Sequence, residues 1–187
     1  MSCLARVAEL VYAMDSKSIV RKGMRVRIPP RALTIRPATI DDARAIAEVH
    51  VASWLAAYRG LVPDEVLDAQ SVDARAAQWD EWLRKGETRT LVAGDVDGFV
   101  TFWETSGEVA ALYVAPDRAR HGIGSALIDA AHAALRAASR DEAFLWVLEA
   151  NAPARVFYAA RGYVADGART VHAATGAQEI RLYRKLA

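Results

Sequence analysis

Residues 112–127 read LYVAPDRARHGIGSAL, and this stretch does most to decide the fold. An apolar run typical of a strand leads into a short loop, and Gly122 then begins a helical apolar pattern that extends to about residue 138. The first N–H groups of a helix have no partner within it, and they lie at the positive end of its dipole. Because glycines let an anion come close to the backbone, the stretch predicts a cradle for a phosphate or diphosphate, to which Arg118 and Arg120 would add charge.

Three interpretations of this glycine-containing turn compete. A dinucleotide-binding GxGxxG fingerprint requires a third glycine, but position 127 is Leu. A P-loop is excluded as well, because no Gly-Lys-Ser/Thr sequence is present at the turn. The third interpretation is a flexible turn that binds nothing, and residues 122–124 alone leave it as open as the phosphate cradle.

A second motif, NAPARVFYAARGY at residues 151–163, directly follows another predicted strand. Asn151 suits a helix N-cap, and Pro153 is tolerated in the first helical turn. Gly162 suits the position that ends a helix. Asn151 and Tyr158 are seven residues apart, so they are expected to project from one face of the helix after two turns.

Together the two motifs resemble those of the GNAT superfamily of acetyl-CoA-dependent N-acetyltransferases. That family's first motif is a strand, a proline, a Gln/Arg-x-x-Gly-x-Gly/Ala loop and a helix; its second is Asn-x-x-Ala-x-x-Phe-Tyr-x-x-x-Gly-Phe/Tyr. Residues 151–163 match the second at every named position, and the resemblance extends over about residues 33–187. The first motif departs at Ala119, which stands where Gln or Arg is expected. The diphosphate contact there would rest on a backbone amide, helped by Arg120.

The resemblance implies where acetyl-CoA would bind. The pantetheine arm would lie in a splay between the first motif's strand and the next, pairing with the backbone of Leu112, Tyr113 and Val114. Asn151 would contact this arm or the loop around it. The diphosphate would be held by the residues from the loop into the helix, which are Arg120, His121, Gly122, Ile123, Gly124 and Ser125.

The resemblance also implies the chemistry, in which a neutral amine attacks the acetyl carbonyl directly. Tyr158 would sit near the thioester sulfur and protonate the leaving thiolate, since a tyrosine has a reference pKa of about 10; the alternative is a core aromatic with a satisfied hydroxyl. Glu108 is the candidate base, or equally an exposed strand-end carboxylate. Trp54 and Tyr58 are candidates for the acceptor pocket, although core packing explains Trp54 better. A non-catalytic acyl-CoA-binding regulatory domain is the alternative function.

The pattern of the remaining residues predicts an α+β, or mixed α/β, domain over residues 33–187. We expect a single central, mostly antiparallel sheet of about seven strands with about four helices and one splayed strand pair. The strands are expected near residues 33–36, 90–93, 99–103, 108–114, 144–149, 163–171 and 178–184. The helices are expected near residues 39–58, 71–83, 122–138 and 152–161, with a short helical piece at 64–67.

Composition separates residues 1–32 from the rest. Of the 24 Lys+Arg and 23 Asp+Glu, seven basic and two acidic residues lie in this segment, which leaves a net charge of −4 on residues 33–187. Residues 25–30, RVRIPP, resemble a translated bacterial tRNA T-arm. We therefore expect residues 1–32 to be a disordered N-terminal extension or sequence upstream of the true start; the alternative is a basic, flexible tail with a minor binding role.

Composition also limits the partners and cofactors. The formal net charge is +1 and no apolar run is long enough to span a bilayer, so we expect no nucleic acid, no membrane and a cytoplasmic location. Cys3 is the only cysteine and the four histidines are scattered, so we expect neither a metal site nor a disulfide framework. The acceptor would be a small-molecule or peptide amine. Family analogy offers both monomers and homodimers.

Overall fold

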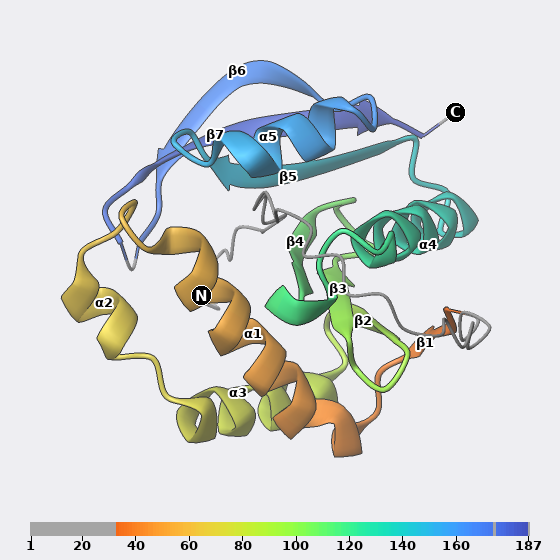
Figure 1. Ribbon diagram of the computed structural model, residues 1–187. Helices are drawn as coiled ribbons and strands as arrows, with labels where there is room; N and C mark the ends of the chain where they lie inside the picture. The colour runs from red at the N-terminus through yellow and green to blue at the C-terminus, as the bar shows by residue number, and fades with distance from the viewer. Residues whose placement is uncertain (1–32, 174, 187) are drawn as a thin grey trace, which may run out of the picture.

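The computed structural model of the protein describes residues 33–173 and 175–186 (Figure 1), so the predictions on residues 1–32 lie outside the described part. The helices and strands of the described chain follow one another in the predicted order. Its elements are β1 (Ile35–Pro37), α1 (Ala43–Tyr58), α2 (Asp64–Asp68), α3 (Val72–Lys85), β2 (Arg89–Ala93), β3 (Gly98–Phe102), β4 (Val109–Val114), α4 (Ile123–Ala137), β5 (Glu142–Leu148), α5 (Ala152–Ala159), β6 (Val164–Val171) and β7 (Gln178–Lys185). Short 3-10 helices at Ile40–Asp42 and Pro116–Arg118 precede α1 and α4.

The seven described strands form two antiparallel sheets, of order β1-β2-β3-β4 and β5-β7-β6. Among the described residues, β4 and β5 are joined by one parallel bridge, between Glu108 and Phe144, where the Phe144 N–H donates to the Gly107 carbonyl at 3.1 Å. Past this bridge the two strands separate. The predicted fold class and the splayed strand pair are therefore confirmed, whereas the expected single sheet is divided at the splay.

Helices cover both faces of the four-stranded sheet, because its inner strands are apolar on both faces. Strand side chains alternate between the faces, so one set packs against α4 and the other against α1 and α3. The set facing α4 includes Leu91, Val100, Phe102 and Leu112, and the set facing α1 and α3 includes Val92, Phe99, Ala111 and Tyr113. All five residues of β3 are buried as a result.

α5 lies against the three-stranded sheet and joins the buried cluster that also contains the apolar face of α4 (Figure 1). Ala154 and Tyr158 of α5 pack in this cluster with Leu145 of β5 and Leu182 of β7. The cluster thus connects the two sheets and brings α5 close to the beginning of α4. None of the described helices combines the length and the apolarity needed to cross a membrane.

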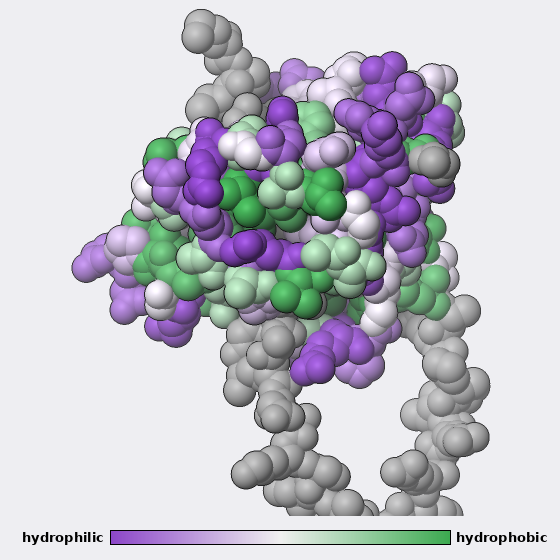
Figure 2. Space-filling view, turned by 90° about the horizontal axis from the view of Figure 1, so that it is seen from above, coloured by the Kyte–Doolittle hydropathy of each residue, from purple (hydrophilic) through white to green (hydrophobic). Residues whose placement is uncertain are grey.

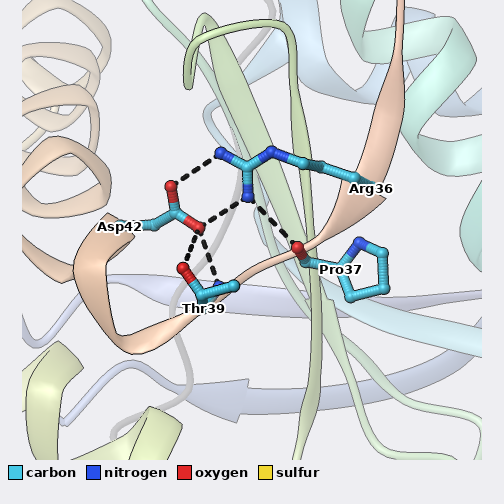
Figure 3. A network of polar contacts seen from close by, with 4 residues as sticks. All are labelled: Arg36, Pro37, Thr39 and Asp42. Atoms are coloured by element: carbon cyan, nitrogen blue, oxygen red, sulfur yellow. Dashed lines mark hydrogen bonds and ion pairs between the residues drawn. The ribbon is translucent and has the colours of Figure 1, made fainter.

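A compact polar network fixes the connection between β1 and α1 (Figure 3). The Arg36 guanidinium donates to both carboxylate oxygens of Asp42, each at 2.7 Å. The Asp42 carboxylate also accepts from the backbone N–H and the hydroxyl of Thr39, at 2.7 and 3.1 Å, which completes a capping box. Chiefly because of the bonds from Arg36, the pKa of Asp42 is lowered to about 2.

Candidate active site

A cavity of about 330 Å³ lies where the loop of the first motif meets α5. Residues from the end of β4, the loop and the first turn of α4 form one side, and α5 with the turn after it forms the other. The lining residues are Val114, Ala119, Arg120, Gly122, Gly124, Ser125, Phe157 and Arg161. The fold therefore brings the two sequence motifs together around one cavity.

The backbone at the beginning of α4 is suited to an anion. Gly122 is the N-cap of α4 with a φ of +82°, and a Cβ added there would meet no atom within 4 Å. A ligand can therefore come close to this part of the backbone from the cavity. The first intrahelical bond runs from the Ala126 N–H to the Gly122 carbonyl, so the helix itself does not use the N–H groups of residues 123–125.

The residues predicted to bind the diphosphate divide into two groups. Arg120, Gly122, Gly124 and Ser125 line the cavity, and Arg120 has a positive φ of 66°. His121 and Ile123 do not line it. His121 is exposed, with Nδ1 2.8 Å from the Ala119 carbonyl oxygen, and the side chain of Ile123 is buried in the core, so neither residue contributes a side chain to the cavity.

Two of the three strand residues predicted to hold the pantetheine arm, Leu112 and Tyr113, do not line the cavity. Leu112 and Tyr113 point to opposite faces of β4, where Leu112 packs toward α4 and the Tyr113 ring stacks on His50 with the centroids 4.7 Å apart. Val114 lines the cavity, and its carbonyl accepts a hydrogen bond from the Ser53 hydroxyl at 2.9 Å. This last contact, which the sequence did not suggest, connects α1 to the open end of the splay.

Asn151 and Tyr158 are both buried, on the helix that the second motif forms. Asn151 is the N-cap of α5, as predicted, and its Oδ1 accepts from the Ala154 N–H at 3.2 Å. The Tyr158 ring makes edge contacts with Phe157 and Tyr163, at centroid distances of 5.2 and 5.3 Å. Tyr158 packs in the same buried cluster as residues of β4 and β5, and neither Tyr158 nor Asn151 lines the cavity.

The other predicted site residues lie farther along the splay or in the core. Glu108 is half-buried at the bridge to Phe144, which is the closed end of the splay. Trp54 and Tyr58 form an edge-to-face pair with centroids 5.0 Å apart and are 5% and 2% exposed. Packing in the cluster between α1 and the four-stranded sheet accounts for this burial, and the role of both rings in acceptor binding stays a prediction.

Arg161 is a residue of the cavity that the sequence argument missed. Its Nη2 donates to the Ser125 hydroxyl and its Nη1 donates to the Phe157 carbonyl at 3.0 Å. The guanidinium carbon lies 3.6 Å from the centroid of the Phe157 ring. The four-residue spacing of Phe157 and Arg161 was the signal that could have revealed this arrangement, because side chains four residues apart come together along a helix and its final turn.

Comparisons with known proteins decide the family. The profile of the acetyltransferase (GNAT) domain matches residues 86–165. An uncharacterized N-acetyltransferase of Bacillus subtilis (strain 168), YuaI, is 32% identical over 139 residues, which are 68% of this chain and 78% of that protein. The chain belongs to the GNAT family of N-acetyltransferases. This confirms the family that the two motifs predicted and makes the protein an acetyl-CoA-dependent acyltransferase.

Further relatives of this GNAT protein agree in sequence and fold. Mycothiol acetyltransferase of Clavibacter michiganensis subsp. michiganensis is 32% identical over 161 residues, which are 83% of this chain and 50% of that protein. The crystal structure of a GCN5-related N-acetyltransferase from Rhodopseudomonas palustris superposes with a TM-score of 0.67 at 25% identity, over 83% of this chain and 96% of that one. PaiA N-acetyltransferase from Thermoplasma acidophilum, solved in complex with coenzyme A, has the same fold, with a TM-score of 0.69 at 20% identity over 83% and 99% of the two chains.

A second hollow in the surface of the GNAT domain lies away from this site. A groove of about 400 Å³ runs along another face of α5, beside β6 and β7, and is lined by Ala152, Arg155, Val156, Ala159, Tyr163, Ala165, Ile180 and Leu182. Figure 2 looks onto the face that carries β6, where apolar residues gather between charged ones.

Within the described residues, no group of three His, Cys, Asp or Glu side chains is placed to hold a metal ion.

Proposed function

We propose that this enzyme transfers the acetyl group of acetyl-CoA to a primary amine, and that the cavity between α4 and α5 binds the diphosphate of CoA. One observation carries the proposal: both GNAT motifs line a single cavity, and Val114 connects that cavity to the open end of the β4–β5 splay. The open space in front of Gly122 fits a phosphate that approaches the N-terminus of α4. The pantetheine arm would then extend along the backbone of β4 toward Tyr158.

In the proposed reaction the amine nitrogen attacks the acetyl carbon, so that a C–N bond forms and the C–S bond breaks. Tyr158 gives its hydroxyl proton to the departing thiolate, and the proton that the attached nitrogen loses as the amide forms returns to Tyr158 directly or through water. The incoming ammonium group must first lose a proton, and Glu108 accepts it directly or through a water molecule. The separate places of these residues, Tyr158 on α5 and Glu108 at the closed end of the splay, allow one to act as acid and the other as base.

The acceptor is proposed to be a small-molecule or peptide amine. The end of α1, with Trp54 and Tyr58, reaches the open end of the splay, because Ser53 bonds to Val114. Aromatic rings at this position would contact the apolar part of an acceptor. The net charge of −4 on residues 33–187 favours a cationic acceptor over an anionic one.

A panel of amines tests this function when CoA release and acetyl-CoA binding are measured on the same preparation. We expect acetyl-CoA to bind and at least one primary amine to raise CoA release above the rate of hydrolysis. Binding without turnover for any amine in a broad panel would support the alternative, a non-catalytic acyl-CoA-binding domain. The absence of acetyl-CoA binding would contradict both functions.

A further inference from the structure

The loop of the first motif lacks one side chain that would contact an anion. Ala119 lines the cavity with a methyl group, at the position where the motif has Gln or Arg. Arg118, the neighbouring cation, lies near acidic groups instead, since its Nε is 3.4 Å from Asp97 and 3.7 Å from Asp117. Arg120 lines the cavity but Arg118 does not, so the loop presents less positive charge to the cavity than its two arginines would together.

Arg161 places a guanidinium on the other side of the same cavity. The residue lies in the turn after α5, where its N–H donates to the Tyr158 carbonyl at 2.9 Å and where Gly162 has a φ of +77°. Its side chain stacks on Phe157 and bonds to Ser125 in the first turn of α4. These contacts hold the guanidinium beside the backbone N–H groups at the beginning of α4, although the residue belongs to the second motif.

We propose that Arg161 binds the diphosphate of the acyl donor in this enzyme, in place of the side chain missing at position 119. This inference rests on the proposed function, which places CoA in the cavity. A planar guanidinium matches two phosphate oxygens at once, and such charge-assisted bonds are stronger than neutral ones. Stacking on Phe157 reduces the freedom of the guanidinium, so less entropy is lost when it binds an anion.

The bond to Ser125 explains how the site would change when a donor binds. The Ser125 hydroxyl accepts from Arg161 in this structure, and a hydroxyl can rotate to donate to a phosphate oxygen instead. The guanidinium and the α4 N-terminus would then contact the same anion from two sides. The competing explanation is that Arg161 only stabilises the end of α5, because it also donates to the Phe157 carbonyl there.

Binding of three ligands to the intact protein separates these explanations. Calorimetry with CoA, 3′-dephospho-CoA and pantetheine is compared for the wild type, Arg161→Gln and Arg155→Gln. Arg155 is a matched control, since it lies on α5, is exposed and donates to the Glu149 carbonyl outside this cavity. We expect Arg161→Gln to weaken CoA and 3′-dephospho-CoA equally, by about ten- to a hundredfold, and to leave pantetheine within about twofold. Arg155→Gln should leave all three unchanged.

Every other outcome contradicts the assignment in an identifiable way. A loss confined to CoA would mean that Arg161 contacts the 3′-phosphate, and an equal loss for all three ligands would mean a structural role. Unchanged affinities for all ligands would overturn the proposal outright. Arg161→Lys distinguishes a lost contact from a misfolded protein. The lysine keeps the positive charge, so this variant should bind CoA more tightly than Arg161→Gln does. A wild-type protein that binds no CoA would instead overturn the proposed function on which this inference rests.

Discussion

Asp42 joins β1 to the beginning of α1 through a single carboxylate, which accepts from Arg36 and Thr39 (Figure 3). Only 10% of its side chain is exposed, compared with 40% for Arg36. The hydrogen bonds from Arg36 and Thr39 to the charged form outweigh the cost of burial, and the pKa of Asp42 therefore falls to about 2 from its ordinary 3.8. A carboxyl group whose pKa is lower in the folded state than in the unfolded state stabilises the folded protein at every pH at which the unfolded chain would carry the negative charge.

Replacing this carboxylate tests the network at the residue scale. Asp42→Asn is expected to lower the free energy of unfolding by about 1–2 kcal/mol at pH 7, because the amide cannot pair with Arg36. The contribution is fully present above the unfolded pKa of 3.8 and is lost as the pH falls through about 2. Urea denaturation at pH 7, 5, 3.5 and 2.5 should show the two proteins converging at the acid end. A difference that does not depend on pH would show that the charge of Asp42 contributes nothing.

Tyr163 is a second residue whose hydroxyl has a particular partner. The second motif accepts Phe or Tyr at this position, and here the Tyr163 hydroxyl lies 2.8 Å from His132 Nε2, with both residues buried. Burial lowers the pKa of His132 to about 4, so the imidazole is neutral at pH 7. A histidine held neutral in the folded state contributes stability above its unfolded pKa of 6.5, and the contribution is lost as the pH falls through about 4.

Tyr163→Phe is therefore expected to destabilise the protein by about 1–3 kcal/mol at pH 7, because it leaves a buried imidazole nitrogen without its partner. Thermal and urea unfolding at pH 7 measure the effect. The double variant His132→Leu/Tyr163→Phe should recover part of the loss, since it removes both polar groups. If Tyr163→Phe unfolds like the wild type, the bond to His132 contributes no stability.

At the scale of elements, the beginning of α4 combines a left-handed backbone conformation at Gly122 with open space in front of it. Gly122→Ala should lower stability by about 1 kcal/mol, because an alanine with this positive φ is strained. It should also weaken CoA binding, since the methyl group projects into the cavity. Gly86→Ala is the matched control: Gly86 ends α3 with a φ of +62° and also has no atom within 4 Å of an added Cβ, but it lies outside the cavity. CoA affinity that falls equally in both variants would contradict the placement of the diphosphate.

The elements that carry the motifs are predictable because local residues set their ends. Asn151 caps α5 through its own side chain, and Gly162 adopts the positive φ that ends the helix, as the sequence predicts. The division into two sheets is not predictable in this way. It depends on whether β4 and β5 stay paired past Glu108 and Phe144, which contacts between distant parts of the chain decide rather than local residues. The contact of Arg161 with Ser125 escapes prediction for the same reason, since it joins two helices that only the fold brings together.

At the scale of the whole molecule, the candidate site depends on both sheets. β4 belongs to the first sheet, α4 packs on that sheet and α5 lies against the second sheet, so the cavity forms only when the two sheets pack together. Conservative changes in the cavity should therefore act on ligand binding, whereas changes in the shared core should act on stability first. Tyr158 belongs to both categories, because it is buried in the shared core and is proposed to donate a proton.

The turnover of Tyr158→Phe, measured beside its acetyl-CoA affinity, tests the central claim most directly. The substitution keeps the ring in the core and removes only the hydroxyl, and Tyr183→Phe, on the second sheet, controls for the loss of a hydroxyl elsewhere. We predict that Tyr158→Phe lowers kcat by about 10²–10⁴-fold, as expected for the loss of a general acid, while the Kd for acetyl-CoA changes by less than about threefold. Turnover equal to that of the wild type would contradict the role of Tyr158 in proton transfer.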